Sequence, residues 1–171
     1  MPRSRITEGA SAPVGVRPTE RAHPLRVRAV LTRCVTHSYV AAMELKGQMQ
    51  VTSWQEDEIR PLEATGSKVT RASIGYRLIG DVDGEAVSDV VMCYRPDGTA
   101  VVVGLWTLTG SAAGQAGSVA FEAIGGYDGT TATAQLRLLS GLSSGGFAAA
   151  RGHGTTSATR EKVEYVLHLE L

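Results

Sequence analysis

Apolar and polar residues alternate through most of the chain, in short stretches that end at turn-forming residues. Residues 48–54, 68–79, 85–94, 99–109, 118–125, 130–139 and 162–171 have this strand pattern, and 147–154 form a further short element that includes a possible helical turn. In a strand, alternate side chains face opposite sides, so one set is expected in the core. The pattern therefore predicts eight short strands.

Turn sequences separate these stretches at roughly the ten-residue spacing typical of all-β barrels and sandwiches. Residues 94–99 are Tyr-Arg-Pro-Asp-Gly-Thr. The proline presets φ at the first corner, and Asp-Gly accepts a positive φ. Related turn sequences occur at 80–84, 110–117 and 127–129. The charged residues 55–61 end in a proline, which cannot donate to a β-ladder, so we expect a loop there.

Eight antiparallel strands in sequence order predict an all-β fold, an eight-stranded up-and-down barrel. At this number of strands a sheet can close around an interior that holds side chains or one small ligand. Closure also removes the exposed edges of an open sheet, which favours a barrel over a sandwich. A chain of 171 residues with 43% hydrophobic residues is long enough for one domain with a sizeable core.

The first 42 residues differ in composition from the rest. They contain seven arginines and two glutamates, which leaves a net charge of −5 on residues 43–171. Arginines interrupt every apolar stretch, so a secretory signal is excluded. Three interpretations stay open: a disordered arm, translated sequence upstream of a true start at Met43, and a basic tether. We assign residues 1–42 to a leader and 43–171 to the barrel domain, and we expect no nucleic-acid or membrane partner.

Neither the cysteines nor the histidines indicate a metal site. Cys34 lies in the leader and Cys93 in a strand, so we expect no structural disulfide and predict a reducing cytoplasm. The four histidines, His23, His37, His153 and His168, have spacings that no metal motif uses. No glycine-rich segment joins a strand to a helix, as a phosphate-binding loop would. We therefore expect no metal and no cofactor.

Several short blocks occur in order along residues 47–171. They are VTSW at 51–54, KVTRAS at 68–73, MCYRPDGTA at 92–100, VGL at 103–105, GGYDG at 125–129 and ARG at 150–152. In these blocks the chain resembles an uncharacterised bacterial domain family, whose members are similar to the allene oxide cyclase β-barrel. The resemblance implies an eight-stranded barrel, commonly oligomeric, with no established activity. The cyclases bind an apolar substrate in the barrel and steer a ring closure with few charged groups.

The resemblance also points to three polar positions, of which this chain keeps one. Asp89 stands where the family commonly has Glu, whereas Trp106 replaces a Glu and Ala123 replaces a His. By alternation Asp89 would share an inward face with Val91 and Cys93. A carboxyl group buried among apolar side chains has a raised pKa, which suits proton transfer. The alternative is that Asp89 is hydrogen-bonded inside the barrel and inert.

These residues suggest a cofactor-free cyclase or isomerase that acts on an apolar metabolite inside the barrel. Asp89 and Tyr165 are the catalytic candidates, and either would polarise one group of the substrate. The substrate-binding candidates are Arg71, Trp106, Phe121, Ala123, Val91 and Cys93, with Arg71 alternatively a solvated exterior residue. The alternative function is a non-catalytic barrel, either a hydrophobic-ligand carrier or a structural subunit. An open cavity would favour an enzyme or carrier, and a filled interior a structural role.

Strand faces that are rich in Ala and Thr and poor in charge could pack against another subunit. Thr131 and Thr133 belong to such a face. Together with the family resemblance, they predict a homo-oligomer, a dimer or a trimer.

Overall fold

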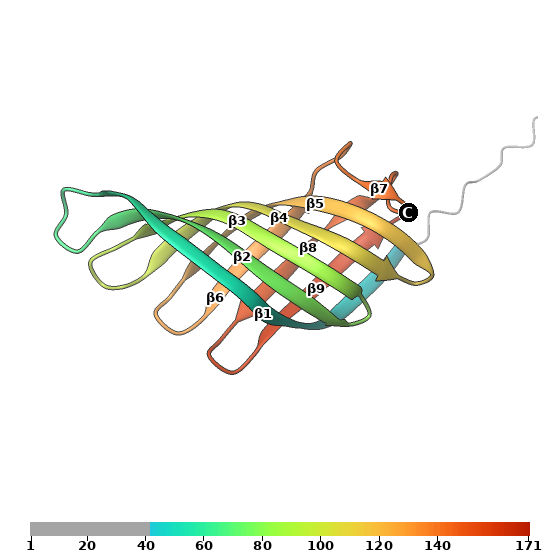
Figure 1. The fold of residues 1–171 in the computed structure, drawn as a ribbon, viewed down its shortest axis with the longest axis horizontal. Helices are drawn as coiled ribbons and strands as arrows, with labels where there is room; N and C mark the ends of the chain where they lie inside the picture. The colour runs from blue at the N-terminus through green and yellow to red at the C-terminus, as the bar shows by residue number, and fades with distance from the viewer. Residues whose placement is uncertain (1–41) are drawn as a thin grey trace, which may run out of the picture. The chain divides into compact units, whose positions relative to one another are not determined.

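The computed structural model describes residues 42–171, which form one antiparallel sheet that closes on itself (Figure 1). The strands are β1 (Ala42–Pro61), β2 (Lys68–Gly80), β3 (Asp83–Tyr94), β4 (Ala100–Ala112), β5 (Gln115–Tyr127), β6 (Ala132–Leu138), β7 (Ser144–Gly145), β8 (Arg151–Ala158) and β9 (Val163–Glu170). Each long strand pairs with its neighbours in sequence, β9 pairs with β1, and the two-residue β7 adds only to β5. The predicted eight-stranded barrel is confirmed, whereas the leader assigned to residues 1–42 lies, except for its last residue, outside the described residues.

Two strands differ most from the sequence prediction, β1 and β8. Residues 55–61, predicted as a loop, are the end of β1. Beyond the Met49–Val163 pair, this part of β1 pairs with β2 alone among residues 42–171, so within this range one edge of the strand is free. A free edge tolerates proline, and charged side chains keep other strands from pairing with it. The seventh barrel strand is displaced as well, because β8 begins only at Arg151 and continues to Ala158.

Two Asp-Gly turns close hairpins as the sequence predicts. Between β3 and β4, Asp97 Oδ1 accepts a hydrogen bond from the Thr99 backbone N–H at 2.9 Å, and Gly98 has a φ of 82°. Between β5 and β6, Asp128 Oδ1 accepts one from the Thr131 backbone N–H at 2.8 Å. These backbone hydrogen bonds lower the pKa of both carboxyl groups. The turn residues therefore fix where the strands reverse.

The interior is packed at the end that holds the β2–β3 and β4–β5 turns. The largest buried side chains there are Leu78, Val82, Leu108, Val119, Phe121, Phe147, Tyr165 and Leu167. Tyr165 is 1% exposed, and its hydroxyl accepts a hydrogen bond from the Val82 backbone N–H at 3.1 Å. Gly47 on β1 permits this arrangement, because a Cβ there would collide with the Tyr165 ring. The connection from β6 to β8 contributes Phe147 and so fills this end of the barrel.

The opposite end of the barrel is slanted. The β1–β2, β3–β4, β5–β6 and β8–β9 hairpins all end there and step back one after another, with β1–β2 projecting farthest (Figure 1). Because β8 and β9 stop first, the inner surface of the longer strands is only partly covered. The slant therefore leaves an opening that leads to the interior.

Phe121 tests the packed part of the barrel. Phe121→Ala is expected to lower the free energy of unfolding by about 3–5 kcal/mol, because Phe121 is 0% exposed and its removal leaves a cavity. Urea denaturation followed by circular dichroism measures the change. Ile79→Ala is the control, since Ile79 is 55% exposed and its truncation should change stability by less than about 0.5 kcal/mol. Equal effects of the two substitutions would contradict this assignment of the core.

Candidate ligand-binding site

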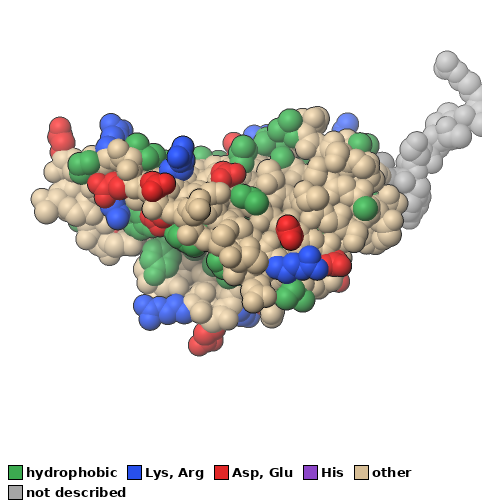
Figure 2. Space-filling model, in the orientation of Figure 1, with side chains coloured by type: hydrophobic (Ala, Val, Ile, Leu, Met, Phe, Trp, Pro, Cys, Tyr) green, Lys and Arg blue, Asp and Glu red, His purple; other side chains and the backbone are tan. Residues whose placement is uncertain are grey.

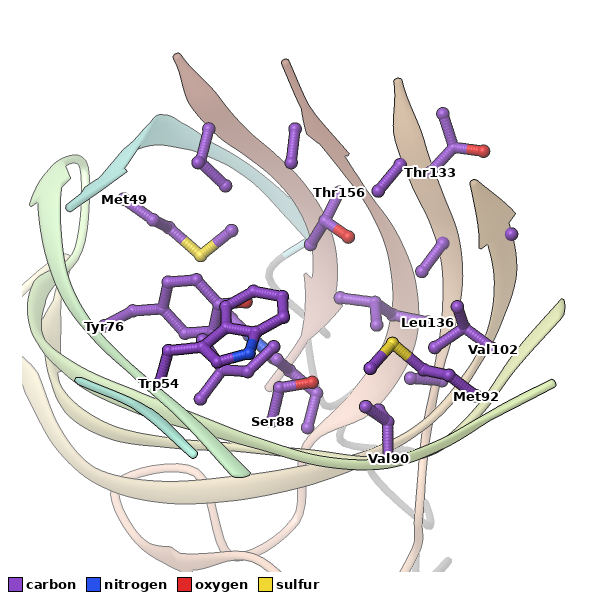
Figure 3. A pocket seen from close by; sticks show the side chains of 18 residues that line it. Met49, Trp54, Tyr76, Ser88, Val90, Met92, Val102, Thr133, Leu136 and Thr156 are labelled. Atoms are coloured by element: carbon purple, nitrogen blue, oxygen red, sulfur yellow. The ribbon is translucent and has the colours of Figure 1, made fainter. Parts of the chain in front are cut away.

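A cavity of about 130 Å³ lies inside the slanted end of the barrel and opens to solvent (Figure 3). All eight barrel strands contribute to its wall. The larger apolar side chains are Met49, Trp54, Ile74, Val90, Met92, Val102, Trp106, Leu136 and Val163, and the polar ones are Tyr76, Ser88, Thr133 and Thr156. Figure 2 shows apolar side chains in the recess below the projecting β1–β2 hairpin. The site is thus an apolar cup with a few hydroxyl groups.

An irregularity in β1 brings two of the lining residues to the same face. Met49 pairs with Leu78 and Trp54 with Ile74, although strict alternation would put residues five apart on opposite faces. The register shifts between Val51 and Ser53, which inserts one extra residue and turns the following side chains over, as a β-bulge does. Trp54 therefore reaches the mouth of the cavity, where it is 54% exposed.

Trp106 forms part of the cavity floor. It is 2% exposed and packs against Phe121, with ring centroids 5.6 Å apart and an angle of 56° between the rings. The small residue Ser88 pairs with Trp106 across β3 and β4, which leaves room for the indole. The Trp106 Nε1–H has no hydrogen-bond partner among residues 42–171. An unpaired buried donor costs about 1–3 kcal/mol, so an acceptor near the floor would stabilise the site.

Tyr76 supplies a hydroxyl group to the wall (Figure 3). Burial raises its pKa to about 12, so the phenol is a protonated hydrogen-bond donor at neutral pH. Among the 18 lining residues Tyr76 is the one side chain that titrates. The cavity that the described residues enclose is therefore uncharged.

A hydrogen-bonded carboxylate stands beside the mouth. Glu56 accepts hydrogen bonds from Trp54 Nε1 at 3.2 Å and from the Tyr94 hydroxyl at 3.1 Å. Burial first, and then the Glu56 charge, raise the pKa of Tyr94 to about 12. Lys68 Nζ lies 5.5 Å from the centroid of the Tyr94 ring. These contacts hold the Trp54 ring in place at the mouth of the cavity. Many charged side chains gather on the neighbouring β1–β2 hairpin (Figure 2).

Four of the candidates from the sequence lie inside the barrel. Trp106 and Ala123 line the cavity, and Phe121 lies behind Trp106 in the packed core. Tyr165 also faces inward, but it belongs to the filled end and does not line the cavity. The structure therefore brings Trp106 and Ala123 together and separates them from Tyr165.

The expected inward placement of Asp89, Val91 and Cys93 is wrong. Asp89 and Val91 are exposed on the outer face of β3, and Cys93 is half-buried there. Both faces of β3 carry apolar residues, so alternation alone does not select the inner one. Ala86 and Ser88 are small enough to pair with the bulky interior residues Leu108 and Trp106, and the barrel therefore closes with their face inward.

Arg71 lies outside as well. It is exposed on the outer face of β2, where it pairs across the ladder with Val91. This is the solvated position that the sequence left open as the alternative. Arg71 therefore does not contact a ligand in the cavity.

Several lining residues were missed by the sequence analysis. Tyr76 shares the inner face with Ile74 and Leu78, so alternation along β2 contains the signal for it. Trp54 could not be found in that way, because its orientation depends on the register shift in β1.

The fold and the site define the class of protein: it is a closed antiparallel barrel with a small apolar cavity that opens at one end. Residues 45–169 match the model of a family described as "Protein of unknown function (DUF3224)", and the chain belongs to this family. No curated protein matches the sequence. The resemblance to the allene oxide cyclases stays a prediction.

One similar solved structure is a protein of unknown function from the DUF3224 family of Shewanella oneidensis MR-1. It is 14% identical, with a TM-score of 0.64, and the match covers 75% of this chain and 97% of that chain. The similarity shows that the two proteins share the fold.

Within residues 42–171, no helix has the length and apolar character needed to cross a bilayer. In the same residues, no three His, Cys, Asp or Glu side chains gather in a way that could hold a metal ion.

The raised pKa of Tyr76 predicts a dependence of stability on alkaline pH. Below pH 10, the ordinary pKa of tyrosine, the phenol is protonated in both the folded and the unfolded protein. Between pH 10 and about 12 the unfolded protein loses this proton first, so the free energy of unfolding falls as the pH rises. Tyr76→Phe should remove this part of the decrease. Chemical denaturation at several pH values measures it, and identical profiles for the two proteins would contradict the burial of Tyr76.

Proposed function

We propose that the barrel binds a small uncharged molecule with an apolar skeleton in the cavity at its open end. The half-open cavity of about 130 Å³, lined almost entirely by apolar side chains, is the observation that supports this function. An apolar cavity of about 150 Å³ inside a protein is known to hold benzene. A six-membered ring, or the end of a longer molecule that projects through the mouth, therefore fits the available space.

The polar groups of the wall suggest one hydrogen-bond acceptor on the ligand. The Trp106 N–H is a buried donor without a partner, and the Tyr76 hydroxyl is held in its protonated form. Both groups can donate to a carbonyl or ether oxygen, and the Ser88 hydroxyl is a third donor that lines the cavity. A few polar groups in an apolar pocket are typical of sites that orient a small ligand.

Binding without turnover has more support than the cyclase or isomerase hypothesis. A cyclase would use the same cavity to hold one reactive conformer of its substrate. Its acid–base group would have to be Tyr76, because Asp89 lies on the outer face and Tyr165 lies in the packed end. A purely structural role agrees with the packed end of the barrel but leaves the open cavity unexplained.

The proposal can be tested with cyclohexanone as the probe and cyclohexene as the matched ring without an acceptor. The chain contains two tryptophans, so the Trp54→Phe variant reports on Trp106 alone by fluorescence. We expect cyclohexanone to change this emission in a saturable manner. Adding Tyr76→Phe should weaken cyclohexanone binding about tenfold, the effect of losing one hydrogen bond worth about 1.4 kcal/mol, and leave cyclohexene binding unchanged.

Tyr127→Phe is the matched control, since the Tyr127 hydroxyl donates to the Gly129 carbonyl in a turn and does not face the cavity. This variant should bind cyclohexanone as the parent does. Failure of both rings to bind would refute the proposed function. Equal loss of both rings in the Tyr76→Phe variant would show that the hydroxyl shapes the cavity without binding the acceptor.

A further inference from the structure

The outer face of β3, β4 and β5 carries a contiguous group of exposed apolar side chains. This outer patch consists of Val87, Val91, Val101, Val103, Leu105 and Ile124, which are 38–51% exposed. Cross-strand pairing places Val91 beside Val103, and Val103 beside Ile124. The patch lies on the outside of the barrel wall and is independent of the cavity and of its proposed ligand.

The size of the outer patch suits the centre of a protein interface. Its six side chains expose on the order of 400 Å², within the range of the largest apolar patches found on monomers, which are often functional. A stable interface buries about 800 Å² on each partner, and somewhat more than half of that surface is apolar. The outer patch with a surrounding ring of polar residues matches that requirement.

Two opposite charges beside the patch make it self-complementary. Arg71 on β2 pairs with Val91, and Asp89 on β3 pairs with Leu105. They are diagonal neighbours, one strand and two residues apart. Both are exposed, and neither takes part in an ion pair within residues 42–171, whereas the nearby Glu122 is paired with Arg137.

We infer that the outer patch binds a second copy of this chain through a two-fold axis. Strands lie about 4.8 Å apart, and alternate residues along a strand about 6.8 Å apart. With these spacings, an axis that runs obliquely between Val91 and Val103 places Arg71 over Asp89 of the partner subunit. The same axis places Ile124 over Val101 of the partner subunit. Each contact occurs twice, as a two-fold interface requires.

The test is the mass of the full chain in solution at micromolar concentration, measured by sedimentation equilibrium. We expect a dimer that Val103→Asp converts to a monomer, and circular dichroism verifies that the variant is folded. Ile79→Asp is the matched control, because Ile79 is 55% exposed on the outer face of β2 and lies outside the outer patch, so this variant should stay dimeric.

The charges provide a second test that does not depend on Val103→Asp folding. Arg71→Glu and Asp89→Arg should each raise the dissociation constant at least about tenfold, and the double variant should return to within about threefold of the parent. A trimer would overturn the two-fold arrangement. So would a double variant whose dimer dissociation constant is no lower than those of the single variants. A monomeric parent protein, as expected if residues 1–41 cover the outer patch, would overturn the inference itself.

Discussion

The hydrogen-bonded pairing of β1 with β9 closes the sheet, and it ends at Met49 and Val163 while β1 continues to Pro61. Where the pairing exists, the barrel wall is complete and side chains fill the interior. Where it ends, the inner face of β1 to β4 is left partly uncovered, and the cavity forms there. The division of the barrel into a packed half and an open half follows from the unequal lengths of these strands.

The packed half of the barrel provides the floor of the cavity in the open half. Trp106 and Phe121 contact each other at the boundary, and both are almost completely buried. Phe121 packs into the core, whereas Trp106 presents a side of its ring to the cavity. A rigid floor of this kind holds the shape of the cavity without a ligand, which reduces the entropic cost of binding one.

The sequence predicted the barrel because each strand is bounded by residues that have a specific turn chemistry. Asp97 and Asp128 make the side-chain to backbone hydrogen bonds that their Asp-Gly sequences imply. The same reasoning predicted only part of the site. Trp106 and Ala123 were placed inside, but the inner face of β3 was not identified, because Val87 and Val91 make its outer face look like core. Trp54 depends on a register shift that no local pattern reveals.

The central claim is that a small ligand enters the open half of the barrel, and methionine methyl groups report on it directly. In a protein with ¹³C-labelled methionine methyl groups, Met49 and Met92 line the cavity, whereas Met43 packs against the core at the filled end. Titration with cyclohexanone is predicted to shift the NMR signals of Met49 and Met92 in a saturable manner and to leave the Met43 signal in place. Unchanged Met49 and Met92 signals at millimolar cyclohexanone, or an equal shift of Met43, would contradict the account.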